Sequence, residues 1–404
     1  MKFAHMADCH VGSWRDQKLK ELSIESFKKA ISICIDKKID FLLIAGDLFN
    51  NALPNIESLR VVVKELRRLK QKKINVYVIP GSHDYSPSGK TMIDVLEEAE
   101  LLKNVFKGTV KDNKIYLSFT IDNNTGVKIT GVLGRRGTLE KNYYDALDTE
   151  SLEKEPGEKI FLFHSAITEL MPKEFSQIES MPLSMLPKGF MYYAGGHIHI
   201  VKNQSFENYT NVVYSGPLFP ANFSELERLS TGGFFIFDNE AEEKIQRIEL
   251  NIKNIYLLEV NANNKSPEQI TSEILEKIKN KEFINTIVLL KVYGKINTGK
   301  ISDIDFNNIF EKIYSQGAYY VLKNTYKLIS EEFEEIKIGF ENIEDVEDSL
   351  IKEHLQQYKI FDKDKEYRLI KDLMNSLSSE KHEGEKVHEY EERIRKEVEK
   401  VLDL

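Results

Sequence analysis

The residues of this sequence best suited to metal chemistry are aspartates and histidines that recur directly after short apolar segments. Imidazole and carboxylate ligands together suit Mn, Fe or Zn, rather than the all-oxygen sites of Mg or Ca. The candidates outnumber the ligands that one ion needs, so the pattern indicates a pair of ions that clamp a phosphate and activate a hydroxide for in-line attack. In chain order the candidates are Asp8, His10, Asp47, His83, Asp84, His164, His197 and His199.

The spacing of these residues supports one shared site. Residues two apart on an extended segment share a face, so Asp8 with His10, and His197 with His199, can point the same way. Asp47 is the natural bridge between two ions because a carboxylate can donate both oxygens. A single histidine after a strand is more often a hydrogen-bonded core or loop residue than a ligand. Five such coincidences are not easily explained in that way.

The segments before these residues have the composition of buried strands. Each is short and almost wholly apolar, and a stretch with helical spacing at 58–69 separates two of them. This alternation predicts a layered α/β fold. Each predicted strand delivers an Asp or a His at its carboxyl end, the edge at which open α/β sheets bind ligands. The predicted strands are 3–6, 41–45, 76–79, 160–163 and 191–194.

Two further regions follow the layered fold. A small α+β domain begins near Lys253, with strands expected at 255–260, 284–293 and 318–322 and helices at 267–278 and 306–314. From about Ser330 the chain is charged and helical. Amphipathic helices are expected in that region because apolar residues recur at helical spacing. They are Leu369, Ile370, Leu373, Met374 and Leu377, and then Val387, Tyr390, Ile394, Val398 and Val401.

Composition limits the classes of protein that fit. The 404 residues are 41% hydrophobic and 30% charged, which is typical of a soluble globular protein, and no apolar run approaches a membrane span. Cys9 and Cys34 are too few for a disulfide framework and are expected to be buried thiols of a cytoplasmic protein. The net charge of -9 is uneven: residues 331–404 carry 13 Lys+Arg and 23 Asp+Glu, so residues 1–330 are close to neutral. That balance permits a local basic surface.

The ordered motifs closely resemble those of the calcineurin-like metallophosphoesterases, and among them the archaeal form of the SbcD-type nuclease subunit of the double-strand-break repair complex. The resemblance covers roughly the first 240 residues. The family blocks are D-x-H, G-D, G-N-H-D or G-N-H-E, a histidine at a strand end, and G-H-x-H. They stand here as Asp8/His10, Gly46-Asp47, Gly81-Ser82-His83-Asp84, His164, and Gly196-His197-Ile198-His199.

The resemblance implies a layered metallophosphoesterase sandwich over 1–250 with two Mn²⁺ per subunit. Asp8, His10 and His199 would hold one ion, His164 and His197 the other, and Asp47 would bridge them. His83, oriented by Asp84, would be the catalytic residue that stabilises the transition state or protonates the leaving oxygen. Ser82 stands where the family has an asparagine ligand, so we expect weaker binding of the second ion.

The same resemblance implies the roles of the other regions. Residues 251–330 would form a capping domain that helps to position DNA. Residues 331–404 would be an acidic helical segment that binds the coiled-coil base of an SbcC-type ATPase. The expected protein is a homodimeric, nucleoid-associated enzyme of the cytoplasm without a membrane partner. Its activities would be 3′–5′ exonuclease on duplex ends and endonuclease on single strands.

Contacts with DNA are predicted from basic residues near the motifs, although each of them taken singly is more often an ordinary surface cation than a phosphate contact. Two alternative functions stay open at this stage: a calcineurin-like phosphodiesterase acting on small phosphodiesters, and a weakly active or inactive scaffold subunit. The extension beyond Lys253 argues against the first, and the near-complete ligand set argues against the second. The candidate DNA contacts are Arg15, Lys18, Lys90, Arg135 and Arg136.

Overall fold

The computed structural model describes residues 1–86, 91–135, 139–175, 177–330, 351, 362–379 and 387–402. The chain divides into two compact units. The first comprises Met1–Leu258, Lys281–Leu290 and Lys312–Asn324, and the second comprises Glu259–Asn280, Lys291–Glu311 and Thr325–Leu404. The division passes through two strands of the small sheet. The domain boundaries at 250 and 330 therefore stay predictions.

The first sheet has six strands in the order β14-β13-β1-β2-β3-β4. Its centre is parallel, because β1 pairs with β2 and β2 with β3 in the same direction, while β13 and β14 are added antiparallel at one edge. The strands are β1 (Lys2–Met6), β2 (Phe41–Ala45), β3 (Asn75–Ile79), β4 (Lys103–Asn104), β13 (Gly232–Asp238) and β14 (Ile245–Leu250).

The second sheet also has six strands, in the order β11-β12-β10-β9-β8-β7. Strands β12, β10, β9 and β8 are parallel neighbours, and β11 and β7 close the two edges antiparallel. The strands are β7 (Thr120–Ile121), β8 (Lys128–Val132), β9 (Lys159–His164), β10 (Tyr192–Gly196), β11 (Lys202–Phe206) and β12 (Tyr209–Tyr214); β5 (Gly108–Lys111) and β6 (Lys114–Leu117) form a separate hairpin.

The two sheets pack face to face around an aromatic core. Phe3 of β1 stacks on Phe41 of β2 with ring centroids 5.0 Å apart, and meets Tyr192 of β10 edge-on at the same distance. Successive residues of β1 point to opposite faces, so Phe3 enters this core and Ala4 enters the core under the helices. Burial on both faces explains why the strands read as continuous apolar runs.

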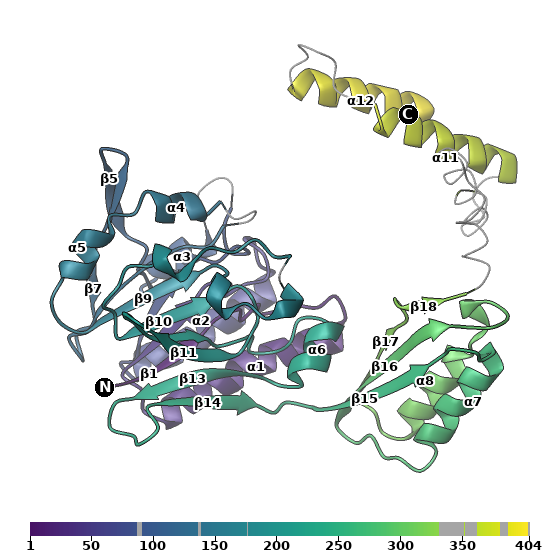
Figure 1. Ribbon diagram of the computed structural model, residues 1–404, viewed down its shortest axis with the longest axis horizontal. Coiled ribbons are helices and arrows are strands. Elements are labelled where there is room, and N and C mark those ends of the chain that lie inside the picture. The colour runs from purple at the N-terminus through teal and green to yellow at the C-terminus, as the bar shows by residue number, and fades with distance from the viewer. Residues whose placement is uncertain are drawn as a thin grey trace. The chain divides into compact units, whose positions relative to one another are not determined.

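Helices cover the outer face of the first sheet (Figure 1). Asp16 caps α1 (Gln17–Asp36) by accepting from the backbone N–H groups of Lys18 and Leu19, and Asn55 caps α2 (Ile56–Gln71). The outer face of the second sheet is covered by short helices and 3₁₀ turns. The elements over the second sheet include α4 (Lys141–Asp145), α5 (Thr149–Lys154), η2 (Thr168–Leu170), η3 (Lys173–Phe175) and η4 (Leu183–Met185). Two further short helices, α3 (Met92–Glu98) and α6 (Phe223–Leu229), pack on the core of the first sheet.

The remaining elements follow the sequence-based expectations closely. Helix α7 (Pro267–Ile278) has the predicted bounds, with a Ser266 capping box and proline at its start. The small sheet has the order β15-β16-β17, with β18 beside β16. The bounds are β15 (Asn254–Asn261), β16 (Thr286–Lys295), η5 (Ile301–Asp303), α8 (Phe306–Ser315), β17 (Tyr320–Asn324), β18 (Leu328–Ile329), α11 (Lys363–Leu377) and α12 (Val387–Val401).

The mixed α/β architecture and the C-terminal helices are confirmed. Both cysteines are buried and free, as expected. Within the part of the chain that the structure describes, no helix has the length and apolar character needed to cross a membrane.

Candidate metal centre

Five strand ends bring the candidate ligands together, but these strands belong to two sheets. β1, β2 and β3 lie in the first sheet, and β9 and β10 lie in the second. The sequence predicts all five ends at a carboxyl edge but does not assign the strands to separate sheets. The structure shows a centre built across the top of the sandwich, where loops after both sets of parallel strands meet.

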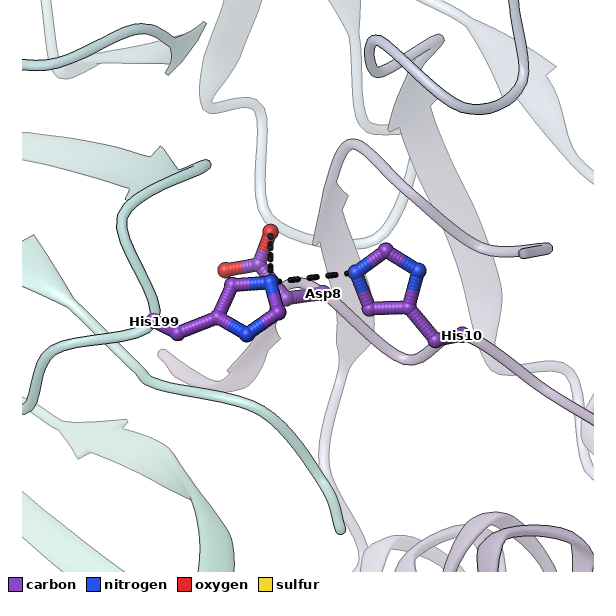
Figure 2. A group of neighbouring side chains, drawn as sticks. All are labelled: Asp8, His10 and His199. Carbon is purple, nitrogen blue, oxygen red and sulfur yellow. Dashed lines mark hydrogen bonds and ion pairs between the residues drawn. The ribbon is translucent and has the colours of Figure 1, made fainter. Parts of the chain in front are cut away.

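One group of ligand atoms comes from Asp8, His10 and His199 (Figure 2). His10 Nε2 lies 3.1 Å from His199 Nε2, and His199 Nε2 lies 3.7 Å from Asp8 Oδ1. Two ligands bound at right angles to one ion about 2.1 Å away lie about 3 Å apart. The convergence of these three side chains therefore fits the ligand spacing around a single ion.

A second group surrounds Asp47. His164 Nε2 lies 3.2 Å and His10 Nε2 lies 3.7 Å from the same oxygen, Oδ2, and Ser82 Oγ donates to that oxygen over 3.4 Å. The other oxygen, Oδ1, accepts from the backbone N–H of His83 over 2.7 Å. Asp47 therefore lies between the first group of ligands and His164, as a bridging carboxylate would.

The orientation of His164 supports metal binding. Its Nδ1 contacts the carbonyl oxygen of Ala45 at 2.8 Å, and because a carbonyl can only accept, this contact places the proton on Nδ1. Its Nε2 is fully buried and makes no well-aligned hydrogen bond. Beside the Asp47 carboxylate this nitrogen holds a proton when no ion is bound, and it would offer its lone pair to a metal ion that displaces the proton. The donor set thus fits a divalent cation of the Mn, Fe or Zn type.

His197 occupies a less defined position. Its ring lies 5.1 Å from the ring of His164, and its backbone N–H donates to both oxygens of Asp8, at 2.9 and 3.2 Å. Among the described residues, it is not part of the three-residue groups whose ligand atoms all lie close together. The backbone of His197 therefore orients Asp8, and its ring borders the part of the centre near His164.

The electrostatics of the centre favour an added positive charge. Burial lowers the pKa of His10 and the pKa of His197 to about 3, so both imidazoles are neutral near pH 7. Burial also disfavours protonation of His164 and His199, but neighbouring carboxylates outweigh it and raise their pKa values to about 10 and about 9. Burial alone would raise the pKa of Asp47, but the charge of His164 outweighs this effect and lowers the pKa. A metal ion would supply the positive charge that these carboxylates attract.

The backbone of the centre is strained at the candidate ligands. Asp8, His10, Asp47, His197 and His199 all have positive φ, between 40° and 101°, which is uncommon outside glycine. Such strain concentrates at functional sites, where surrounding contacts hold it in place. The backbone of Gly46 lies so close to His164 that an added Cβ would be 2.1 Å from His164 Nδ1, so this position requires glycine.

The expectation that Asp84 orients His83 needs correction. The carboxylate of Asp84 instead accepts backbone N–H groups of Leu48, Phe49 and Gly81 at 2.9 to 3.1 Å, which ties the loop after β2 to the loop after β3. His83 Nδ1 contacts the carbonyl oxygen of Asn50 at 2.9 Å. Burial and the charge of Asp47 raise the pKa of Asp84 to about 7.

Only some of the candidate DNA contacts fall among the described residues. Arg15 and Lys18 are exposed at the start of α1. The guanidinium of Arg135 lies 4.6 Å above the ring of Tyr85, donates to its hydroxyl over 3.0 Å and donates to Tyr143 over 3.3 Å. Arg135 therefore braces the loop that carries His83, and its expected contact with DNA stays a prediction. Lys90 and Arg136 lie outside the described residues.

Two residues of α6, which no sequence pattern indicates, contact His199. Glu225 Oε1 lies 3.0 Å from His199 Nδ1, and Arg228 donates to the carbonyl oxygen of His199 over 3.1 Å. A cavity of about 400 Å³ opens beside them and extends to His197 and Phe175. The N-cap pattern Asn222 to Glu225 predicts a helix start, but nothing in it indicates which residue the glutamate would face.

Comparison with known proteins agrees with this geometry. Residues 1–201 match the family described as calcineurin-like phosphoesterase. The DNA double-strand break repair protein Mre11 of Methanococcus maripaludis is 28% identical over 70% of this chain and 75% of its own length. The proteins of the same name from Methanocaldococcus jannaschii and Archaeoglobus fulgidus are 27% and 25% identical, over 89% and 78% of this chain and 90% and 75% of their own lengths. Residues 1–201 therefore form a calcineurin-like phosphoesterase domain, and the chain is a hydrolytic enzyme whose fold implies divalent metal ions at this centre.

Proposed function

We propose that this protein is a Mn²⁺-dependent DNA nuclease that processes DNA ends in double-strand-break repair. The observation that carries the proposal is the convergence of imidazole and carboxylate ligands from five strand ends in two sheets. The substrate is inferred from the similarity to archaeal proteins named for double-strand-break repair, which extends beyond the phosphoesterase domain. Exonuclease action on duplex ends and endonuclease action on single strands both belong to the proposal. Such a substrate would place the protein at the nucleoid in the cytoplasm.

Two ions are assigned to the ligand groups. Asp8, His10 and His199 would hold the first, and Asp47 would bridge it to the second. When bound, the ions supply Lewis-acid charge for the phosphate and an activated water. The residues assigned to the second ion are Ser82, His164 and His197.

His83 is the proposed catalytic residue. The carbonyl oxygen of Asn50 can only accept a hydrogen bond, so its contact with Nδ1 places a proton there and leaves Nε2 for the substrate. The His83 ring lies 4.8 Å from the ring of His10, at the border of the ligand cluster. An imidazole there can stabilise charge on a phosphate oxygen or protonate a leaving 3′-oxygen. Asp84 acts indirectly, through the backbone of the loops that hold Asp47 and His83.

The other regions are proposed to serve the same task. Residues 251–330 would cap the nuclease domain formed by residues 1–250 and help to position DNA. The C-terminal helices α11 and α12 form a hairpin in which Tyr390 donates to the carbonyl of Ser379 over 3.1 Å. We assign this hairpin, within the acidic segment 331–404, to binding an SbcC-type ATPase. A homodimer through early helices of the nuclease domain completes the proposed assembly.

The test is degradation of linear duplex DNA and of single-stranded circles by the full chain in Mn²⁺, beside Mg²⁺ alone and beside Asp47→Asn. We expect shortened DNA with the wild type in Mn²⁺ and loss of activity in the variant. Cleavage of a small phosphodiester without cleavage of DNA would favour a small-molecule phosphodiesterase. Inactivity on both substrates, even with the ATPase added, would favour a scaffold subunit.

A further inference from the structure

Helix α6 contacts the candidate ligand His199 at two points. Glu225 Oε1 lies 3.0 Å from the ring nitrogen Nδ1, and Arg228 donates to the backbone carbonyl oxygen over 3.1 Å. Glu225 and Arg228 are three residues apart, so they lie on the same face of the helix. One short helix therefore holds both the side chain and the backbone of a single residue of the metal centre.

The carboxylate of Glu225 is itself fixed in place. Its Oε2 accepts from the backbone N–H of Ala221 over 2.8 Å, and its Oε1 accepts from the side-chain amide of Asn222 over 2.7 Å. The backbone N–H of Glu225 donates in return to the side chain of Asn222 over 3.0 Å. This N-terminal capping arrangement aims the carboxylate at His199, and 13% of the Glu225 side chain is exposed.

The ring of His199 is less enclosed by packing than the rings of His10 and His164. Its side chain is 18% exposed, compared with 4% for His10 and 0% for His164. Its backbone has a φ of 47°, in the left-handed region that a residue with a Cβ adopts at a cost. Packing alone therefore constrains this ring less than its neighbours.

We propose that Glu225 and Arg228 are positioning residues for metal binding by His199. With its carboxylate 3.0 Å from Nδ1, Glu225 would keep a proton on that nitrogen and leave Nε2 to face His10 and Asp8, and Arg228 would hold the strained backbone. Carboxylates placed in this way behind a ligating histidine change metal affinity by about 10- to 100-fold when removed. The inference rests on the proposed metal site and names residues that act through His199 rather than on substrate.

The experiment is a calorimetric titration of Mn²⁺ alone into the metal-free full chain. We expect Glu225→Ala to raise the Kd of one of two sites by about 10- to 100-fold and to leave the other site close to the wild type. Glu225→Gln keeps an oxygen that can accept from Nδ1–H, so it should lose less affinity than Glu225→Ala. Glu227→Gln is the matched control, because it removes the same charge from a different face of α6, and it should bind Mn²⁺ like the wild type.

His199→Ala separates failure of this inference from failure of the proposed function. If His199→Ala leaves Mn²⁺ binding unchanged, the assigned metal site is wrong, and this inference fails with it. If His199→Ala weakens binding but Glu225→Ala and Glu225→Gln do not, only the positioning role is overturned. Thermal unfolding in EDTA checks that each variant is folded, and Glu225→Gln preserves shape and decides the question if Glu225→Ala unfolds.

Discussion

In the metal centre Asp8, Asp47 and His164 are almost fully buried, whereas helix α11 contains no buried residue among those described. The centre is closed by bonds within the first unit, such as His164 Nδ1 to Ala45 O and His197 N to Asp8. The hairpin instead keeps apolar side chains accessible, with Leu377 63% exposed. The chain therefore closes the metal centre with its own residues, and the accessible apolar side chains of the hairpin support its proposed role in binding a partner.

The largest expected effect is the loss of catalysis on removing the proposed catalytic residue, with metal binding retained. His83→Ala should lower kcat on DNA by about 10²- to 10⁴-fold, the usual contribution of a general acid or base. The variant should still bind two Mn²⁺, because we assign His83 to the reaction and not to the ions. Metal analysis of the variant with one ion or none would show that His83 is a ligand and that the assignment is wrong.

A change in the hairpin should instead weaken partner binding and leave catalysis unchanged. Leu373→Glu places a charge in the apolar stripe of α11 and should weaken binding of the partner ATPase by more than about 30-fold, as expected for an apolar anchor of an interface. Nuclease activity of the isolated chain should stay unchanged. Asn375→Glu adds the same charge outside the stripe and serves as the control. Equal affinity of both variants in a pull-down titration would remove the hairpin from the interface.

Variants of Ser82 test whether the second metal site has its full set of ligands. Its hydroxyl reaches Asp47 Oδ2 over 3.4 Å, and an asparagine at this position would offer an amide oxygen in its place. We expect Ser82→Asn to tighten the weaker Mn²⁺ site by about tenfold, the order of magnitude that changes beside metal ligands produce. Ser82→Ala is the comparison that removes the hydroxyl without adding a ligand. An unchanged titration for Ser82→Asn would mean that water or another residue already completes the second site.

The change expected to affect the metal centre least concerns a buried histidine that is not assigned to the ions. His5 Nδ1 contacts Tyr192 OH at 3.1 Å between the two sheets, and burial lowers the pKa of His5 to about 3. Below pH 6.5 the unfolded chain binds a proton at this position and the folded chain does not, so stability falls as pH falls from about 6.5 to 3. The slope is at most about 1.4 kcal/mol per pH unit. Urea unfolding of His5→Asn should show a shallower pH dependence than the wild type in this window.

The sequence predicts the elements of the centre better than its assembly. The runs before Asp47 and His83 are strands because they are apolar on both faces, and the structure places them as β2 and β3. The division of the five strands between two sheets could not be predicted, because hydrophobic periodicity and composition do not determine which strands pair. The contacts of Glu225 and Arg135 also depend on tertiary packing, which brings α6 to His199 and Tyr85 to Arg135.

Metal stoichiometry tests the two-ion centre most directly. The full chain, dialysed against EDTA and then titrated with Mn²⁺, should bind two ions per chain by calorimetry and by elemental analysis. Asp47→Asn removes the bridging carboxylate and should bind at most one ion tightly while staying folded. A wild type that binds one ion or none, or an Asp47→Asn variant that binds two ions as tightly as the wild type, would contradict a centre bridged by Asp47.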